Sequence, residues 1–294
     1  MRTLVEHRLR LPLRVALGGL RHRDVVLLEG PSGWGECSPL PGYPSDPARC
    51  RAAAEEAAAG RWPPPRRSLV AVNALVPGVP PVHAAVLAGA AVDAGFGTVK
   101  VKVGDPSSVE RVAAVRDAVG PGVRVRVDAN GAWDVETAVA AVAAMARYDV
   151  ELVEQPVISI DDLARLRRRV AVPLAADECV RDLADARRLA ALGAADALVL
   201  KAQPLGGVTA ALQVADAVGI PVIVSSMYET SIGLAAGLAL AAALDELPYA
   251  CGLGTADLFA ADVVADPLIP VDGTLAVRRP VADPGLLARY AVGG

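Results

Sequence analysis

Three amines are the most informative side chains of this sequence. The chain carries 29 Lys and Arg residues, and its only lysines are Lys100, Lys102 and Lys201. Valine and lysine alternate from Val99 to Val103, which is the period of a β-strand and places the Lys100 and Lys102 amines on one face. A lysine amine can lose its proton, whereas a guanidinium cannot do so near neutral pH. We therefore expect the lysines to carry acid–base chemistry.

Three acidic residues lie where strands are expected to end. Asp128, Glu154 and Asp177 each directly follow a short apolar run that predicts a β-strand. The C-terminal ends of parallel strands meet on one face of a sheet or barrel. Carboxylates that converge there repel one another unless a cation neutralises them, and an all-oxygen ligand set suits Mg²⁺. The set contains no His or Cys, which argues against zinc. The sequence therefore predicts a magnesium site.

The same residues also have purely structural interpretations. An Asp at a strand end most often caps the next helix, but better caps follow each acid: Asp134 or Thr137, Asp161 and Asp182. Strand lysines commonly extend their amines to solvent, but lysine is rare in this arginine-rich chain. Acids at three strand ends, with lysines on flanking strands, favour the metal site over these interpretations.

The elements that must position these residues repeat along the chain. From residue 70 onward, short apolar strands alternate with longer helical segments at intervals of about 25 residues, the scale of one barrel unit. Strands joined in this way must pair in parallel. The sequence therefore predicts an α/β fold, a TIM-type (β/α) barrel. Its expected strands are residues 70–75, 98–103, 123–127, 151–153, 173–176, 197–200, 221–224 and 249–252.

A small α+β capping domain is expected beside the barrel. We assign residues 1–67 to it and residues 68–265 to the catalytic barrel. The segment Pro-Val-Asp-Gly-Thr-Leu predicts a hairpin-like piece that brings part of 266–294 back to the N-terminal domain. The capping elements expected are strands at 3–10, 24–28 and 33–36 and a helix at 46–59.

On barrel strands two and six, Lys102 and Lys201 should face each other across the metal.

Composition restricts the partners. A net charge of −4 provides no electrostatic footprint for nucleic acid. The longest apolar run, residues 232–244, is shorter than the about 20 residues that span a bilayer, so no membrane insertion is expected. The four cysteines lack metal-ligand spacing, and the N-terminus lacks an apolar signal core. We expect a cytoplasmic protein with a small-molecule carboxylate substrate; the sequence carries no signal of oligomeric state.

The motifs around these residues, taken together, resemble one family. They are Lys-Val-Lys at 100–102, Val-Asp-Ala-Asn-Gly-Ala-Trp at 127–133, Val-Glu-Gln-Pro at 153–156, Ala-Asp-Glu at 176–178 and Leu-Lys at 200–201. As a set they resemble the enolase superfamily in its muconate-lactonising subgroup, over nearly the whole chain. The resemblance implies that Asp128, Glu154 and Asp177 bind Mg²⁺ and that Lys102 and Lys201 are the acid/base pair.

Two further segments, Gly33–Gly42 and Ser225–Gly233, resemble one branch of that subgroup, which acts in menaquinone biosynthesis. Resemblance to this branch implies a lyase that removes water, with the help of the metal, from a cyclohexadiene carboxylate carrying a succinyl chain. Lys102 would take the α-proton and return a proton to the departing hydroxyl. Lys201 would stabilise the enediolate electrostatically.

The resemblance also implies supporting roles around this pair. Arg126 and Asn130 would orient the substrate carboxylate, and the loop 42–45 would close over the site. Lys100 is a cation beside Lys102 and would favour its loss of a proton. The residues implied to contact the succinyl arm are Ser225, Ser226 and Gly254.

Other functions remain open at this point. An N-succinylamino acid racemase or a dipeptide epimerase could use the same lysine pair on the two faces of a substrate. Dipeptide epimerases typically carry Asp-x-Asp on strand eight, where this chain has Gly252–Asp257 instead. A mandelate-racemase-like mechanism needs a histidine beyond strand six, and the chain has none there. A non-catalytic barrel is disfavoured because the three acids and both lysines are present.

Overall fold

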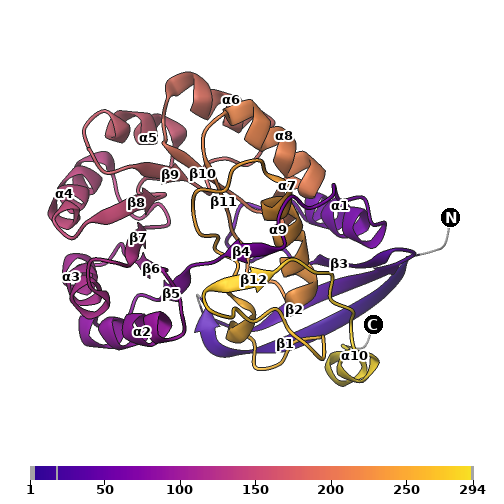
Figure 1. Cartoon of the computed structure of the whole chain (residues 1–294). Coiled ribbons are helices and arrows are strands. Elements are labelled where there is room, and N and C mark those ends of the chain that lie inside the picture. Colours follow the sequence, from indigo (N-terminus) through magenta and orange to yellow (C-terminus); the bar gives the residue numbers. More distant parts are fainter. Residues whose placement is uncertain (1–3, 18, 293–294) are drawn as a thin grey trace.

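A barrel of parallel strands lies beside a three-stranded antiparallel sheet (Figure 1). This computed structural model describes residues 4–17 and 19–292. Residues 1–3, 18 and 293–294, which belong to the predicted capping domain and tail, lie outside the described residues. The predicted α/β fold with a TIM-type barrel is confirmed.

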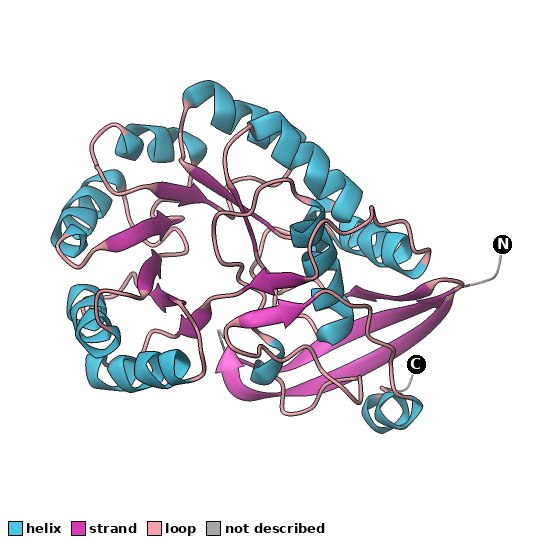
Figure 2. Ribbon diagram, in the orientation of Figure 1, coloured by secondary structure: helices cyan, strands magenta, loops and turns pink. Residues whose placement is uncertain are grey.

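Seven strands of the barrel form one parallel sheet and follow each other in space in the order of the sequence. Figure 2 shows them as an inner ring with helices outside. This order arises because each strand is joined to the next by a helix that crosses the outer face. The strands are β5 (Ala74–Val76), β6 (Thr98–Lys102), β7 (Arg124–Asp128), β8 (Val150–Glu154), β9 (Leu174–Ala176), β10 (Ala197–Leu200) and β11 (Val222–Val224).

The barrel closes through single-residue bridges where the sequence predicts an eighth strand at 249–252. Cys251 pairs with Val72, and Gly252 pairs with Ser225, both in parallel. The Cys251 N–H also donates to the Ala71 carbonyl, and the Gly252 N–H donates to the Val224 carbonyl. Two residues therefore connect the first and seventh strands, without a regular strand.

The first predicted strand, residues 70–75, is split in two. β4 (Leu69–Ala71) pairs antiparallel with β12 (Thr274–Ala276) in the tail, whereas β5 belongs to the seven-stranded parallel sheet. The tail therefore returns to the chain at the barrel's first strand. It also meets the N-terminal sheet, since Ala291 bridges to Leu9.

Helices surround the barrel on the outside (Figure 2). They are rich in alanine, which allows close packing on the strands, and within the described residues four of the eight α-helices begin at a residue whose side chain caps the first N–H groups. They are α2 (Pro81–Asp93), α3 (Ser108–Val119), α4 (Val135–Ala146), α5 (Ile160–Arg167), α6 (Leu183–Leu192), α7 (Ala202–Leu205), α8 (Val208–Val218) and α9 (Ser231–Ala243), followed by the 3₁₀ helix η1 (Ala256–Leu258).

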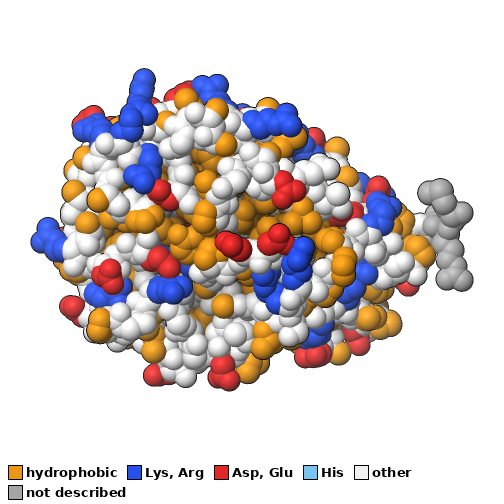
Figure 3. Space-filling model, turned by 45° about the horizontal axis from the view of Figure 1, so that its top comes forward, with side chains coloured by type: hydrophobic (Ala, Val, Ile, Leu, Met, Phe, Trp, Pro, Cys, Tyr) orange, Lys and Arg blue, Asp and Glu red, His pale blue; other side chains and the backbone are white. Residues whose placement is uncertain are grey.

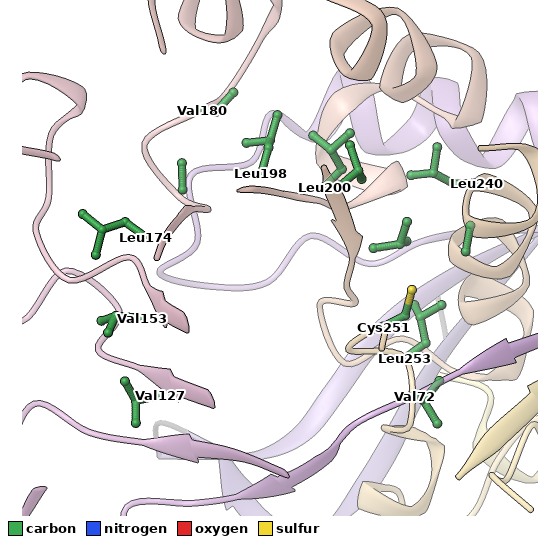
Figure 4. Close-up of a cluster of buried hydrophobic side chains, with 14 of the residues drawn as sticks. Val72, Val127, Val153, Leu174, Val180, Leu198, Leu200, Leu240, Cys251 and Leu253 are labelled. Carbon is green, nitrogen blue, oxygen red and sulfur yellow. The ribbon is translucent and has the colours of Figure 1, made fainter. Parts of the chain in front are cut away.

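Alternation along each strand separates the hydrophobic core from the chemistry. On β6 and β7, Val99, Val101, Val125 and Val127 are fully buried and belong to the large core that includes the helices. Figure 4 shows members of this core, among them Val127. The intervening lysines, Arg126 and aspartate point to the other face, which is the barrel interior.

The N-terminal sheet consists of β1 (Val5–Leu17), β2 (Leu20–Gly30) and β3 (Gly33–Cys37), covered by α1 (Pro47–Ala58). α10 (Pro284–Tyr290) packs beside β1 (Figure 1). β1 is longer than the predicted 3–10 because its pairing with β2 continues to Pro12 and, after a register shift, to the Leu17–Leu20 pair. The domain boundary expected between residues 67 and 68 stays a prediction.

The surface mixes charges of both signs. On the face in Figure 3, acidic and basic side chains are interspersed and hydrophobic side chains gather near the centre. Within residues 4–17 and 19–292, no helix is both long and apolar enough to cross a membrane.

Candidate active site

The predicted chemical residues meet at the C-terminal ends of the barrel strands. Parallel register places Lys102 beside Asp128 and Asp128 beside Glu154 at one level. Asp177 and Lys201 directly follow β9 and β10. A cavity of about 910 Å³ opens at this level, and all of these residues except Glu154 line it. Glu154 is buried and reaches the site through Lys100.

Two amines bond to the acids on the β6–β8 side of the cavity. The Lys100 Nζ lies 2.8 Å from Glu154 Oε1 and 3.0 Å from Asp128 Oδ2. The Lys102 Nζ donates to Asp128 Oδ2 and to Asn130 Oδ1, each at 2.7 Å. The two side chains therefore share one carboxylate, and Lys102 is the more accessible of the two amines.

Lys201 approaches from β10 and forms a buried ion pair with both oxygens of Asp177. Tyr43 Oη donates to Asp177 Oδ1 at 3.0 Å and accepts from Lys201 Nζ at 3.2 Å. The same ammonium lies 4.5 Å from the centre of the Tyr43 ring, within cation–π range. A residue of the predicted lid loop thus contacts both partners of the pair.

Burial and charge shift the protonation of this cluster. Burial raises the pKa of Glu154 to about 7, and the charge of Asp128 adds to the shift. Burial also raises the pKa of Asp177. Burial opposes ionisation of Asp128 as well, but the Lys100 and Lys102 ammonium groups outweigh it and lower the pKa of Asp128.

The two buried amines respond in the opposite sense to burial. Burial alone would lower the pKa of Lys100, but the charges of Asp128 and Glu154 raise it above its usual value. The pKa of Lys201 is likewise raised, because the charge of Asp177 outweighs burial. Both amines are therefore held as ammonium ions, which stabilise negative charge in the cavity.

The donor set fits a hard divalent cation. The three carboxylates stand on successive strands, with Asp128 1%, Glu154 2% and Asp177 4% exposed. Oxygen-only donors of this charge suit Mg²⁺. Each of the three carboxylates is paired with a lysine amine. Within the described part of the chain, no three Asp, Glu, His or Cys side chains lie close enough together to hold a metal ion in this arrangement.

Two strand-end residues adopt the left-handed backbone region that non-glycine residues seldom occupy. Asn130 has a φ of 45°, and its side-chain amide donates to Glu178 Oε1 at 2.8 Å. Gln155 has a φ of 38°, and its Oε1 accepts from the Asp177 N–H at 2.7 Å. Gln155 thus fixes the backbone that carries Asp177. Gln155 belongs to the Val-Glu-Gln-Pro motif, from which the sequence alone indicated no role for it.

Arg126 is not among the residues that line the cavity, and its expected part in orienting the substrate carboxylate stays a prediction. It stands beside Lys100, one layer below Asp128, and is 1% exposed. Its guanidinium bonds to Glu151 and to the Ala250 carbonyl on the other side of the barrel. The side chain instead fills the barrel floor. The sequence could place Arg126 on the inward face but could not distinguish the layers.

The expected contacts of the succinyl arm all line the cavity: Ser225, Ser226 and Gly254. Ser226 Oγ lies 3.0 Å from Thr255 Oγ1, which also lines it. At Gly254 a Cβ would come within 3.2 Å of Pro270, so a side chain would crowd this wall. The cavity is also lined by residues for which the sequence indicated no role, among them Leu40, Asn73, Leu75, Ile158, Glu178, Arg181, Met227 and Thr255.

Comparison with known families agrees with this geometry. The family model described as "Enolase C-terminal domain-like" matches residues 83–289, and the one described as "Enolase N-terminal domain-like" matches residues 9–58. The muconate lactonizing enzyme from Pseudomonas fluorescens has the same fold, with a TM-score of 0.88, 21% identity and coverage of 99% of this chain and 98% of that one. The fold and the site thus define a member of the enolase superfamily.

Curated relatives narrow the assignment. The chain is 53% identical over 275 residues to the o-succinylbenzoate synthase of Thermobifida fusca, covering 92% of this chain and 86% of the relative. It is 49% identical over 288 residues to the o-succinylbenzoate synthase of Mycobacterium marinum, covering 96% and 86%. Within the superfamily, the chain belongs to the o-succinylbenzoate synthase family.

Proposed function

We propose that this protein is a lyase that dehydrates 2-succinyl-6-hydroxy-2,4-cyclohexadiene-1-carboxylate to 2-succinylbenzoate, in menaquinone biosynthesis. The observation that carries the proposal is the convergence of Lys102 and Lys201 with the carboxylates of Asp128 and Asp177 on one cavity. Glu154 lies buried behind them and bonds to Lys100. The relatives at about half identity support the choice of substrate.

Asp128, Glu154 and Asp177 would hold Mg²⁺, which polarises a substrate carboxylate when it is bound. Lys102 removes the proton α to that carboxylate, and the electron pair moves into the carboxylate. The Lys201 ammonium stabilises the negative charge that develops. Lys102 then returns the proton to the neighbouring hydroxyl, the C–O bond breaks, and water leaves as the ring becomes aromatic.

Accessory residues orient these steps. Asn130 and Asp128 both accept from the Lys102 amine, which fixes its direction toward the cavity. Ser225, Ser226 and Gly254 are proposed to contact the succinyl arm, and the 42–45 loop to cover the site. Lys100 is proposed to act only electrostatically, since it is already engaged by Asp128 and Glu154.

The wider assignments belong to the same proposal. We infer a capping domain of residues 1–67 with part of 266–294 and a catalytic barrel of residues 68–265. The match of the N-terminal family model to residues 9–58 supports this division. We also infer a cytoplasmic location, which the four free cysteines support. A small-molecule carboxylate is the proposed partner, with neither nucleic acid nor membrane.

The direct test uses purified protein with Mg²⁺ and the cyclohexadiene carboxylate, following the absorbance of the aromatic product. Lys102→Ala and Lys201→Ala should each lower kcat by roughly a hundredfold or more. Removal of metal by EDTA should stop the reaction, and added Mg²⁺ should restore it. Arg165→Ala, on the exposed side of α5, is the matched control. Racemisation of N-succinyl amino acids much faster than dehydration would reject the proposal.

A further inference from the structure

Arg23 on β2 is a buried cation bonded only to backbone carbonyls. It is 2% exposed, and its Nε donates to the Tyr228 carbonyl at 3.2 Å. Its two Nη atoms donate to the carbonyls of Ser38, Pro39 (3.3 Å) and Met227 (3.3 Å). Among the residues that the structure describes, it forms no ion pair with an acid. A buried guanidinium is costly unless its donors are satisfied, so this arrangement needs a reason.

The four carbonyls belong to two loops that are far apart in the sequence. Ser38 and Pro39 begin the lid segment, whose next residues, 40–44, line the active-site cavity. Met227 and Tyr228 follow β11 and line the same cavity. A single side chain from the N-terminal sheet therefore connects two cavity walls.

Each loop is held by further backbone contacts at or beside the residues that Arg23 bonds. Tyr228 has a φ of 59°, a left-handed conformation that costs free energy for a tyrosine. Its carbonyl accepts from Arg23 at the point of strain. On the other loop, the Ser38 N–H donates to Gln203 Oε1 at 2.6 Å, two residues beyond Lys201. The root of the lid is thus fixed to Arg23 on one side and to the helix after Lys201 on the other.

We propose that Arg23 is a positioning residue that holds the lid root and the 226–228 loop in one fixed relation, so that both walls contact the succinyl arm together. This inference rests on the proposed dehydration. Arg23 touches no cavity surface itself and acts through the two loops. Only a planar guanidinium carries enough donors for four separate carbonyls, because an ammonium has three.

The test compares Arg23→Lys with Arg21→Lys, an exposed arginine on the same strand. At a temperature where circular dichroism shows both variants folded, Arg23→Lys should raise KM and the Kd for 2-succinylbenzoate about tenfold, with kcat within about threefold. Arg23→Met should show the larger effect. Arg21→Lys should behave as wild type. A purely structural role would lower the Tm of Arg23→Lys and leave its KM unchanged, which would overturn the proposal.

Hydrogen exchange tests the connection without any assay of activity. The backbone amides of segments 38–45 and 226–230 should both exchange faster in Arg23→Lys than in Arg21→Lys. This expectation does not depend on which substrate the protein turns over. In the wild type, 2-succinylbenzoate should slow exchange in both segments. If 2-succinylbenzoate slowed exchange in only one of the two segments, the proposal would be contradicted. This measurement uses the wild type alone, so it does not depend on the folding of a variant. Absence of dehydration by the wild type would instead reject the proposed function.

Discussion

Tyr43 shows how one lid residue can act on the charged centre. Its hydroxyl bonds to Asp177 and Lys201, and its ring lies against the Lys201 ammonium. Both contacts favour the charged form of the amine. The lid therefore adds to the electrostatic field of the site as well as covering it.

Tyr43 substitutions should separate these two contributions. Tyr43→Phe keeps the ring and should lower kcat/KM about tenfold to thirtyfold, because the hydroxyl loses its hydrogen bonds with both Asp177 and Lys201, each worth about 1 kcal/mol. Tyr43→Leu also removes the cation–π contact and should cost a further threefold or more. Steady-state kinetics at saturating Mg²⁺ provide the measurement. Tyr148→Phe, outside the cavity lining, is the control. Equal activities of the two Tyr43 variants would exclude a role for the ring.

At this scale the sequence predicted residue types better than contacts. The rarity of lysine selects Lys100, Lys102 and Lys201, and all three line the cavity. Their roles in the reaction stay predictions. No comparable signal marks Arg23, since arginine is abundant in this chain and its partners lie far away in the sequence. Arg126 lies on the inward face, as its strand position predicts, but its guanidinium bonds within the barrel floor and not at the level of the cavity.

At the scale of elements, the sequence predicted two of the three helix caps correctly. Asp134 and Asp182 cap α4 and α6 as expected. The cap of α5 is Ser159, two residues before the expected Asp161. Asp161 instead pairs with Arg188 on the surface. Ser and Asp compete for the same N–H groups when they stand close together, and the backbone path, which sequence patterns do not specify, decides between them.

Substitution at the α5 cap should reveal which side chain holds the helix start. Ser159 Oγ accepts from the Asp162 N–H at 3.1 Å and donates to the Asp162 carboxylate at 2.8 Å. Ser159→Ala should lower the free energy of unfolding by about 1 kcal/mol. Asp161→Ala should leave it unchanged within error, because its ion pair is exposed. Urea denaturation followed by circular dichroism measures both, and the reverse ranking would show Asp161 to be the cap.

At the scale of the whole molecule, buried glutamates from the N-terminal segment cap barrel helices. Glu56 on α1 accepts from the Val208 N–H at 2.6 Å at the start of α8. Gly207 precedes this helix with a φ of 126°, and a Cβ there would lie 2.3 Å from the Glu56 carboxylate, so only glycine fits. Glu36 on β3 accepts from the Gly233 N–H at 3.0 Å in the first turn of α9. Carboxylates favour helix N-termini, which explains this mode of docking. No local pattern predicts such long-range caps.

Glu36 should make the stability of the molecule depend on pH. Burial raises the pKa of Glu36 to about 7, and the charge of Glu229 adds to this, while Ser38, Thr230 and Arg23 oppose it. The folded state therefore binds a proton more tightly than the unfolded chain, whose Glu36 carboxyl has its ordinary pKa of 4.5. Stability from this group is complete below about pH 4.5 and is lost as the pH rises through about 7, by up to about 3 kcal/mol.

Glu36→Gln should remove this part of the pH dependence, since the amide keeps one acceptor oxygen for α9 but does not titrate. Urea unfolding of wild type and variant from pH 5 to pH 8 measures the difference between their two curves, in which the other buried acids cancel. Glu56→Gln, the equivalent change at α8, measures how much stability is lost with a capping charge at another barrel helix. Parallel curves for wild type and Glu36→Gln would mean that the four donors around Glu36 keep its carboxylate ionised throughout, and that docking of the N-terminal sheet on α9 is purely charge-assisted.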